Sequence, residues 1–192
     1  MRILDLTAAA TALLFGVAPL ASARAQDAAA RDSVQADARL VRHAIADNML
    51  EVRLGQIAQR KATDKAVQGF AQRMVTDHQR LEDQWTDLAK KYGIAVPDSL
   101  GTAGRQKVRS METAGKSSFD KAYMTAMLKG HADEADHLRT EVDSARSKPV
   151  QKLIDYERPI ILEHLQAAAN AAKEVGVDST VVNRSKEVAE GK

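Results

Sequence analysis

The stretch that decides the fold is residues 64–93, DKAVQGFAQRMVTDHQRLEDQWTDLAKKYG. Its apolar residues and one histidine recur in alternating steps of four and three, which places them on one face of an α-helix. They are Val67, Ala71, Met74, His78, Leu81, Trp85 and Leu88. Asp64 is a suitable N-cap, and Gly93 suits the left-handed residue that ends many helices. The stretch therefore predicts a helix from Asp64 to Tyr92 that contributes one long face to a packed bundle.

Three further helices are predicted around this one. Apolar residues at helical spacing run from Val34 to about Ala62, and again over residues 117–145, where Ser117 and Asp120 resemble a capping box. The turn at residues 147–149 then leads into a fourth helix that ends at Val175, before Gly176. Pro159 lies inside this helix and predicts a kink or bulge near residues 155–157.

The connections between these helices predict the topology. The turns between the first and second helices and between the third and fourth are short, so each pair should be antiparallel. About 23 residues join the second helix to the third, enough to cross the length of a bundle, and they contain a short helical piece over residues 105–113. We therefore expect an all-α, ferritin-like antiparallel four-helix bundle with a long crossover. An ordinary up-and-down bundle is the alternative.

The N-terminus has the pattern of a secretory signal peptide. Arg2 precedes a short apolar run over residues 8–20, which Ala23-Arg24-Ala25 follows as an A-x-A cleavage site. The run is too short to span a membrane. We expect cleavage after Ala25, a protein that is periplasmic or secreted, and no transmembrane segment in it.

These features predict three parts of the chain. Residues 1–25 form the signal peptide, residues 26–176 form the bundle domain, and residues 177–192 form a polar, disordered tail. The absence of cysteine excludes disulfides and a lipid-modified cysteine anchor.

Composition and motifs exclude several functions. The chain has 28 basic and 26 acidic residues with no basic stripe, so no nucleic-acid partner is expected. It lacks a cysteine nucleophile, the G-x-S-x-G and H-E-x-x-H motifs, and a glycine-rich phosphate loop. No catalytic residue is therefore assigned, and an enzyme is not the expected function.

Three stretches share one spacing, in which an aromatic residue, an apolar residue and a histidine follow one another at four-residue steps. Each step turns only about 40° around a helix axis, so each stretch stacks its three residues along one face. The stretches are Phe70-x3-Met74-x3-His78, Tyr123-x3-Met127-x3-His131 and Tyr156-x3-Ile160-x3-His164. The three histidines should therefore be buried, where each imidazole needs hydrogen-bond partners or a metal ion.

The histidines lie near the middle of their helices, and Glu51 falls at the same height on the first helix. Glu51, His78, His131 and His164 are thus a candidate ligand set for one transition-metal ion, with Zn, Cu or Fe as the expected metals. Further carboxylates could orient the imidazoles or add a ligand. These supporting carboxylates are Asp47, Asp77, Glu134, Glu157 and Glu163. The alternative is a buried hydrogen-bond network of histidine and glutamate without metal.

Several linked segments resemble the bacterial exported proteins grouped as domain of unknown function 4142, DUF4142. They are Phe70–His78, Ala89–Ile94 with Pro97, Phe119–Tyr123 with His131, and Pro159 with Glu163-His164-Leu165. The likeness covers about residues 37–174 and implies a ferritin-like helical bundle without an established activity. The recurring positions of that family map onto Glu51, Asp77, His78, His131 and His164.

One departure from working ferritin-like di-iron proteins bears on the metal. Those proteins use Glu-x-x-His on two helices, whereas Val75 precedes His78 by three residues and Ile161 precedes His164 by three. A single ion is therefore expected rather than a di-iron centre.

Three functional hypotheses follow. The first is an exported metal-binding bundle that acts in metal buffering or envelope stress. The second is a structural or interaction module of the cell envelope that binds a protein partner, and the third is a redox enzyme, which requires an open coordination position. The sequence indicates no substrate and no oligomeric state.

Overall fold

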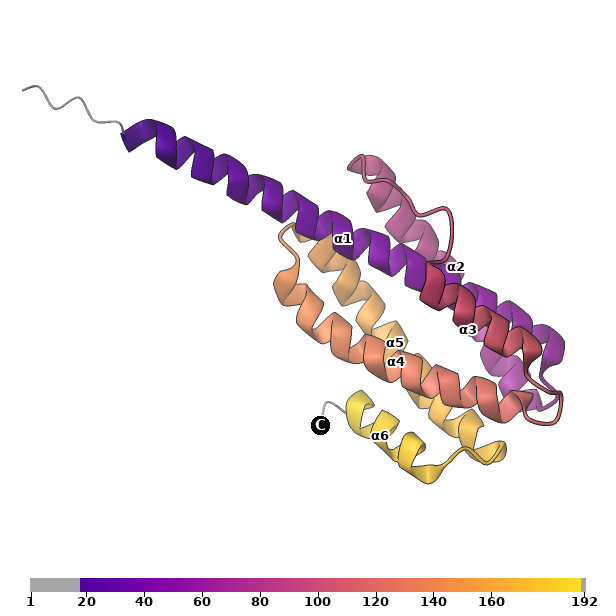
Figure 1. The fold of residues 1–192 in the computed structure, drawn as a ribbon. Helices are drawn as coiled ribbons and strands as arrows, with labels where there is room; N and C mark the ends of the chain where they lie inside the picture. Colours follow the sequence, from indigo (N-terminus) through magenta and orange to yellow (C-terminus); the bar gives the residue numbers. More distant parts are fainter. Residues whose placement is uncertain (1–17, 191–192) are drawn as a thin grey trace, which may run out of the picture. The chain divides into compact units, whose positions relative to one another are not determined.

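The computed structural model describes residues 18–190, with the side chains of residues 30–190. This part of the chain forms six helices and no strand, which confirms the all-α prediction (Figure 1). The helices are α1 (Ala18–Lys61), α2 (Lys65–Lys91), α3 (Thr102–Thr113), α4 (Phe119–Ser144), α5 (Lys148–Glu174) and α6 (Ser179–Ala189). The chain divides into two compact units between Asp32 and Ser33, and every side-chain contact described below lies in the second unit.

The predicted ends of α2 and α5 are confirmed. The Asp64 carboxylate accepts hydrogen bonds from the backbone N–H groups of Ala66 and Val67, as an N-cap does. Gly93 and Gly176 follow the C-caps of α2 and α5 with φ of 66° and 67°, a conformation that a side chain disfavours. Helix α1 begins earlier than Val34, and part of the predicted signal peptide, residues 1–17, lies outside the described residues.

The predicted capping box at the start of α4 is wrong. The N-cap is Ser118, and its side chain makes no capping hydrogen bond. Asp120 instead accepts hydrogen bonds from the backbone N–H groups of Thr63 and Asp64 and from the Thr63 hydroxyl, at 2.7 to 3.2 Å. This carboxylate therefore holds the α1–α2 turn against the first turn of α4.

The prediction of a disordered tail over residues 177–192 is wrong for residues 179–189, which form α6. Asp178 caps this helix by accepting from the backbone N–H of Thr180. Val177 and Val182 are buried, and α6 packs on α4 and α5. The apolar residues of this short segment are few, but they are spaced so that they extend the core.

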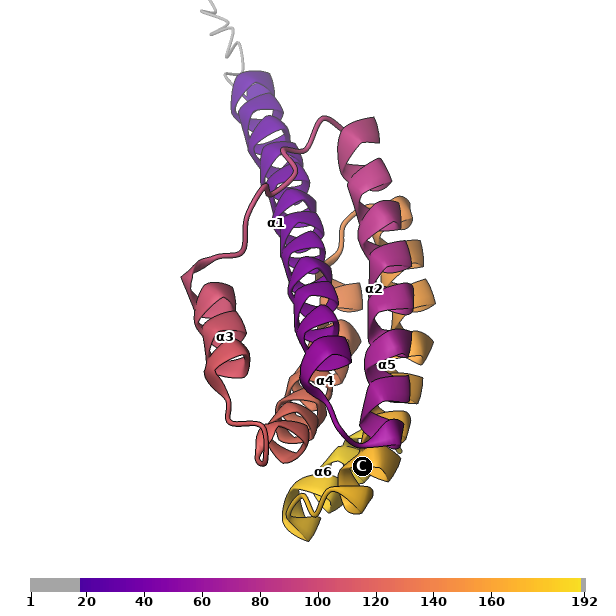
Figure 2. The same cartoon turned by 90° about the vertical axis from the view of Figure 1, so that its right-hand side faces the viewer.

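The long helices of the second unit form the two antiparallel pairs that the short turns predict. Helix α1 and α2 run antiparallel across a short turn, and so do α4 and α5 (Figures 1 and 2). The chain between α2 and α4 crosses α1 and returns through α3 to the end from which α2 began, so α2 and α4 run in the same direction (Figure 2). Within residues 18–190, no helix is both long and apolar enough to cross a membrane.

Glycine allows one close contact between α1 and α2. A Cβ atom at Gly55 would lie 2.8 Å from Val75 Cγ2 and 3.2 Å from the carbonyl oxygen of Ala71. Any larger residue at position 55 would therefore push the two helices apart.

The core consists of two apolar clusters with a layer of polar residues between them. The Phe70 cluster includes Leu50, Leu54, Met74, Tyr123 and Leu165, and the Trp85 cluster includes Ile45, Leu138, Ile154 and Ile161. At or near the boundary between the clusters, each long helix carries polar side chains that are at least nine-tenths buried. We call these side chains the polar layer: Asn48, Glu51, His78, His131, Glu157 and His164.

Candidate metal centre

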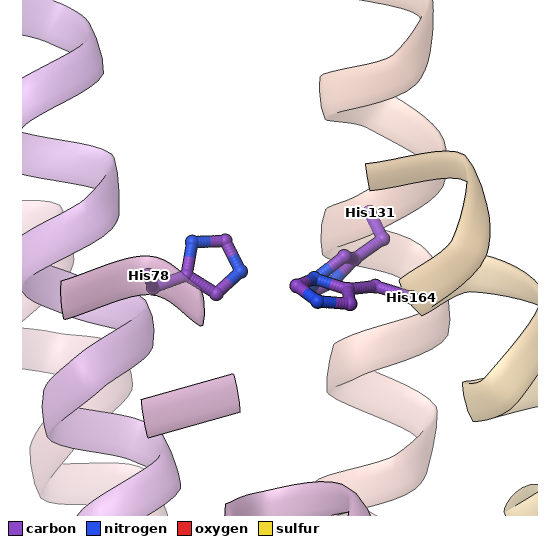
Figure 3. Close-up of side chains that lie close together, drawn as sticks. All are labelled: His78, His131 and His164. Carbon is purple, nitrogen blue, oxygen red and sulfur yellow. The ribbon is translucent and has the colours of Figure 1, made fainter. Parts of the chain in front are cut away.

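Three imidazoles from three helices meet in the polar layer. His78 projects from α2 towards His131 of α4 and His164 of α5 (Figure 3). All three side chains are fully buried, and the ring centroids are 5.1 to 5.6 Å apart. One ring nitrogen of each residue lies within 4.8 Å of the other two. The sequence predicted this meeting of His78, His131 and His164, and the three could hold a metal ion.

Each imidazole makes one hydrogen bond to a group outside the cluster. His78 Nδ1 lies 2.8 Å from Asn48 Oδ1, His131 Nδ1 lies 3.0 Å from the Met127 carbonyl oxygen, and His164 Nε2 lies 3.0 Å from Asp77 Oδ2. All three partners are acceptors, so each of these ring nitrogens carries the proton. The other nitrogen of each neutral ring therefore carries a lone pair.

Those second nitrogens have no hydrogen-bond partner. They are His78 Nε2, His131 Nε2 and His164 Nδ1. A buried polar atom without a partner costs free energy, and a site that keeps three of them together needs an explanation. One nitrogen of each ring lies within 4.8 Å of its counterparts, so the three imidazoles can act together as metal ligands, with the outer hydrogen bonds fixing the ring orientations.

Burial keeps the imidazoles neutral. It lowers the pKa of His131 from 6.5 to about 3, with a further contribution from His164, and it lowers the pKa of His78 well below 6.5. Burial also lowers the pKa of His164, although the hydrogen bond to Asp77 opposes this shift. At neutral pH all three rings are therefore in the form that binds metal.

Asp77 supports His164 from the edge of the core. Burial raises the pKa of this carboxyl group, but the hydrogen bond with His164 and the nearby Arg73 and Arg80 outweigh burial and lower it. Both arginines lie within 3.3 Å of its carboxylate. Asp77 therefore remains ionised and accepts a hydrogen bond from His164 Nε2, the role predicted for it.

A second network, which the sequence reading did not anticipate, supports His78. The Asn48 amide donates to Glu157 Oε1 at 2.9 Å and to the Ala44 carbonyl, which leaves Oδ1 facing His78. Trp85 Nε1 donates to Glu157 Oε2 at 2.8 Å. Asn48 follows Val41 and Ile45 in steps of four and three, so its place in an apolar stripe was the signal that could have identified it.

The remaining predicted residues lie elsewhere. Glu51 is buried, but it does not belong to the group whose ligand atoms lie within 4.8 Å of one another, and its Oε2 has no partner. Glu51 lines a separate cavity with Asp47, Glu134 and Glu157. Glu163 lies at the surface, where its carboxylate is 2.6 Å from Arg73.

The third repeated stretch differs from the other two. Phe70 and Tyr123 are buried as predicted, whereas Tyr156 is 41% exposed, so the prediction that it shares the buried face is wrong. The buried face of α5 instead passes through Ile154, Glu157, Ile161 and His164 in steps of three and four. Repeated four-residue steps drift around the axis, and on α5 the drift carries the aromatic residue out of the core.

Comparison with known proteins gave one match. The model of the family described as "Domain of unknown function (DUF4142)" matches residues 21–171, most of the chain, as the resemblance in the sequence predicted. No curated protein and no solved structure matches the chain.

Proposed function

We propose that this chain, which belongs to the DUF4142 family, binds one transition-metal ion through His78, His131 and His164. The observation that carries the proposal is the set of three buried ring nitrogens without partners, one from each histidine. The opposite nitrogen of every ring is already bonded to an acceptor. A metal-free hydrogen-bond network leaves these three nitrogens unexplained, whereas one metal ion satisfies all of them.

The donor set selects the kind of metal. Neutral imidazoles suit Zn, Cu and Fe, whereas Mg and Ca prefer oxygen ligands. Nitrogens at about 2.1 Å from one tetrahedral ion are about 3.4 Å apart, so the ligand nitrogens, now within 4.8 Å of one another, need to approach by up to about 1.4 Å. Three protein ligands leave the fourth position of a tetrahedral ion to solvent or another small ligand.

The proposed setting is outside the cytoplasm. The charged start, short apolar run and A-x-A site of residues 1–25 support export to the periplasm or beyond. The order of the long helices, with the crossover through α3, supports a ferritin-like arrangement. Because the imidazoles are buried and no catalytic residue is assigned beside them, metal buffering or a role in envelope stress fits better than catalysis.

Metal analysis of the mature protein, purified without an affinity tag, tests the proposal. We expect about one transition-metal ion per chain, and its loss in His78→Ala and in His131→Ala. The matched control is Gln79→Ala, since this residue follows His78 on α2 but is exposed and lines neither site. Wild-type protein that stays free of metal after incubation with Zn²⁺, Cu²⁺ and Fe²⁺, yet folds stably, would overturn the proposal in favour of a structural role for the network.

A further inference from the structure

A second group of ionisable side chains lines a cavity of about 210 Å³ beside the polar layer. Carboxyl groups enter it from α1, α4 and α5, and one ammonium group enters it from α3. The carboxyl groups are Asp47, Glu51, Asp133, Glu134, Glu141 and Glu157, and the ammonium group is that of Lys107. His43 and His137 also line the cavity, with ring centroids 5.9 Å apart.

Glu51 is the residue that distinguishes this cavity from an ordinary acidic surface. Its side chain is 8% exposed, and its Oε2 is buried without any hydrogen-bond partner. A hypothetical Cβ atom at Gly130 would lie 3.8 Å from Glu51 Oε1, so the glycine leaves this part of the cavity free of side-chain atoms. A buried carboxylate oxygen facing such a space lacks the partner that folding normally provides.

The carboxyl groups of the cavity are unfavourable to ionise together. Burial raises the pKa of Glu134 well above 4.5, and the neighbouring Glu157 and Glu51 raise it further. His43 and Lys107 oppose the effect of burial on the pKa of Asp47. Lys107 opposes it on Glu51, yet the pKa of Glu51 stays raised, at about 7. A divalent cation would stabilise the ionised form of these carboxyl groups and would give the free oxygen of Glu51 a partner.

We propose that this cavity is a second cation site, in which Glu51 and Glu134 bind a divalent metal ion through carboxylate oxygens. Glu157 contributes negative charge from the side, while its own oxygens accept hydrogen bonds from Asn48 and Trp85. Carboxylate oxygens suit Mn²⁺, Mg²⁺ and Ca²⁺, in contrast to the imidazole site. This assignment gives Glu51 a role other than fourth ligand of the histidine cluster.

The second site would touch the first through one short chain of hydrogen bonds. Glu157 lines the cavity, Asn48 donates to Glu157, and the Asn48 oxygen faces His78. The two sites nevertheless use different ligands, so each can be removed without removing the other.

Binding of Mn²⁺ alone, measured by the loss of the free-ion electron paramagnetic resonance signal, tests the proposal. The His131→Ala protein is the background, because it keeps the cavity but lacks one imidazole ligand. We expect it to bind Mn²⁺, and we expect Glu51→Gln with Glu134→Gln added to weaken binding at least about tenfold. Carboxylate-to-amide changes keep the shape of the side chain. The amide at position 51 also removes the cost of burying a charged carboxylate, so these variants should fold.

The matched control changes the net charge by the same amount at positions outside the cavity. Asp143→Asn with Glu174→Gln alters two exposed carboxylates that do not line the cavity. We expect Mn²⁺ binding to be unchanged in this variant and to become tighter in Lys107→Met, relative to Lys116→Met on the exposed surface. Equal weakening in both double variants would mean diffuse attraction and would overturn the proposal, as would the absence of Mn²⁺ binding.

The experiments distinguish a failure of the proposed carboxylate site from a failure of the proposed histidine site. A protein that binds Zn²⁺ through the imidazoles but no Mn²⁺ contradicts only the second site. A protein that binds Mn²⁺ with the predicted sensitivity to Glu51 but takes up no Zn²⁺, Cu²⁺ or Fe²⁺ supports the second site and contradicts the first.

Discussion

The histidine cluster and the carboxylate cavity are neighbours in the same layer, yet burial affects them in opposite ways. Burial lowers the pKa of His131 to about 3 and raises the pKa of Glu51 to about 7. Both shifts favour the neutral form. A neutral imidazole is ready to bind a metal ion, whereas a neutral carboxyl group must first lose its proton. One buried layer can thus combine a proposed site that is ready for a metal ion with a proposed site at which the metal must compete with protons.

The largest expected effect on metal binding distinguishes the two regions by the metal that each binds. In His131→Ala, Zn²⁺ should no longer stabilise the protein, whereas at 100 times its dissociation constant it should stabilise the wild type by about 2.7 kcal/mol. For a chain of this size that corresponds to about 5–10 °C in Tm. Calorimetric unfolding scans with and without Zn²⁺ measure it. Glu51→Gln should keep the shift; losing it there would mean that the two regions form one site.

Removing the support of His78 should have the next largest effect. Asn48→Ala takes away the acceptor of His78 Nδ1 and one donor to Glu157. The ring then loses its fixed orientation, so we expect Zn²⁺ to bind about 10–100-fold more weakly. Competition with a chromophoric chelator measures this change. Gln59→Ala, which alters an exposed amide on the same helix, is the control, and equal affinities in the two variants would contradict a positioning role for Asn48.

The dependence of stability on pH should distinguish the carboxylates from the imidazoles in metal-free protein. The pKa of Glu51 rises from 4.5 in the unfolded chain to about 7 on folding, so its contribution to stability is present below pH 4.5 and is lost as pH rises through 7. Glu51→Gln should therefore become more stable than wild type above pH 7, by up to about 3 kcal/mol. Urea unfolding at pH 5 and pH 8 measures the difference. A difference independent of pH would show that Glu51 titrates normally.

The imidazoles should show the opposite trend. Their folded pKa values lie below 6.5, so their contribution is present above pH 6.5 and is lost as pH falls towards 3. The wild type should lose stability from pH 6.5 to pH 4 more steeply than the His78→Ala, His131→Ala double variant in the same urea experiment. Parallel curves for the two proteins would mean that these rings are accessible to protons in the folded state.

The smallest expected effect concerns a carboxylate at the surface. Glu163 is 66% exposed and pairs with Arg73, so Glu163→Gln should change the free energy of unfolding by about 0–1 kcal/mol and leave Zn²⁺ affinity unchanged. Chemical denaturation and metal titration measure the two quantities. A clear loss of metal affinity would place Glu163 among the groups that orient His164, as its position beside that residue predicted.

The sequence predicted what depends on local patterns. Asp64, Gly93 and Gly176 mark helix ends by backbone chemistry that acts within a few residues, and the three histidines stand on apolar faces whose spacing is visible in the sequence. Prediction from the sequence failed where contacts with distant parts of the chain determine the local structure. Asp120 resembles a local cap, but it has better donors in a turn 56 residues away. The short apolar pattern of α6 is too weak alone and becomes stable only on α4 and α5.

The features of the candidate site also fall into those that local sequence patterns predict and those that contacts between helices determine. Burial of the imidazoles could be read from periodicity, but their hydrogen-bond partners come from other helices or the backbone. Asn48 could not be predicted, because an uncharged amide in an apolar stripe does not by itself indicate a buried hydrogen-bond network. Glu51 was placed at the correct height, but height alone does not distinguish the histidine cluster from the cavity beside it.

X-ray absorption spectroscopy of the mature, untagged protein loaded with one equivalent of Zn²⁺ tests the central claim most directly. The account predicts a first shell with three imidazoles at about 2.0–2.1 Å, and two in His131→Ala. A shell of oxygen ligands with one imidazole or none, unchanged in His131→Ala, would contradict it.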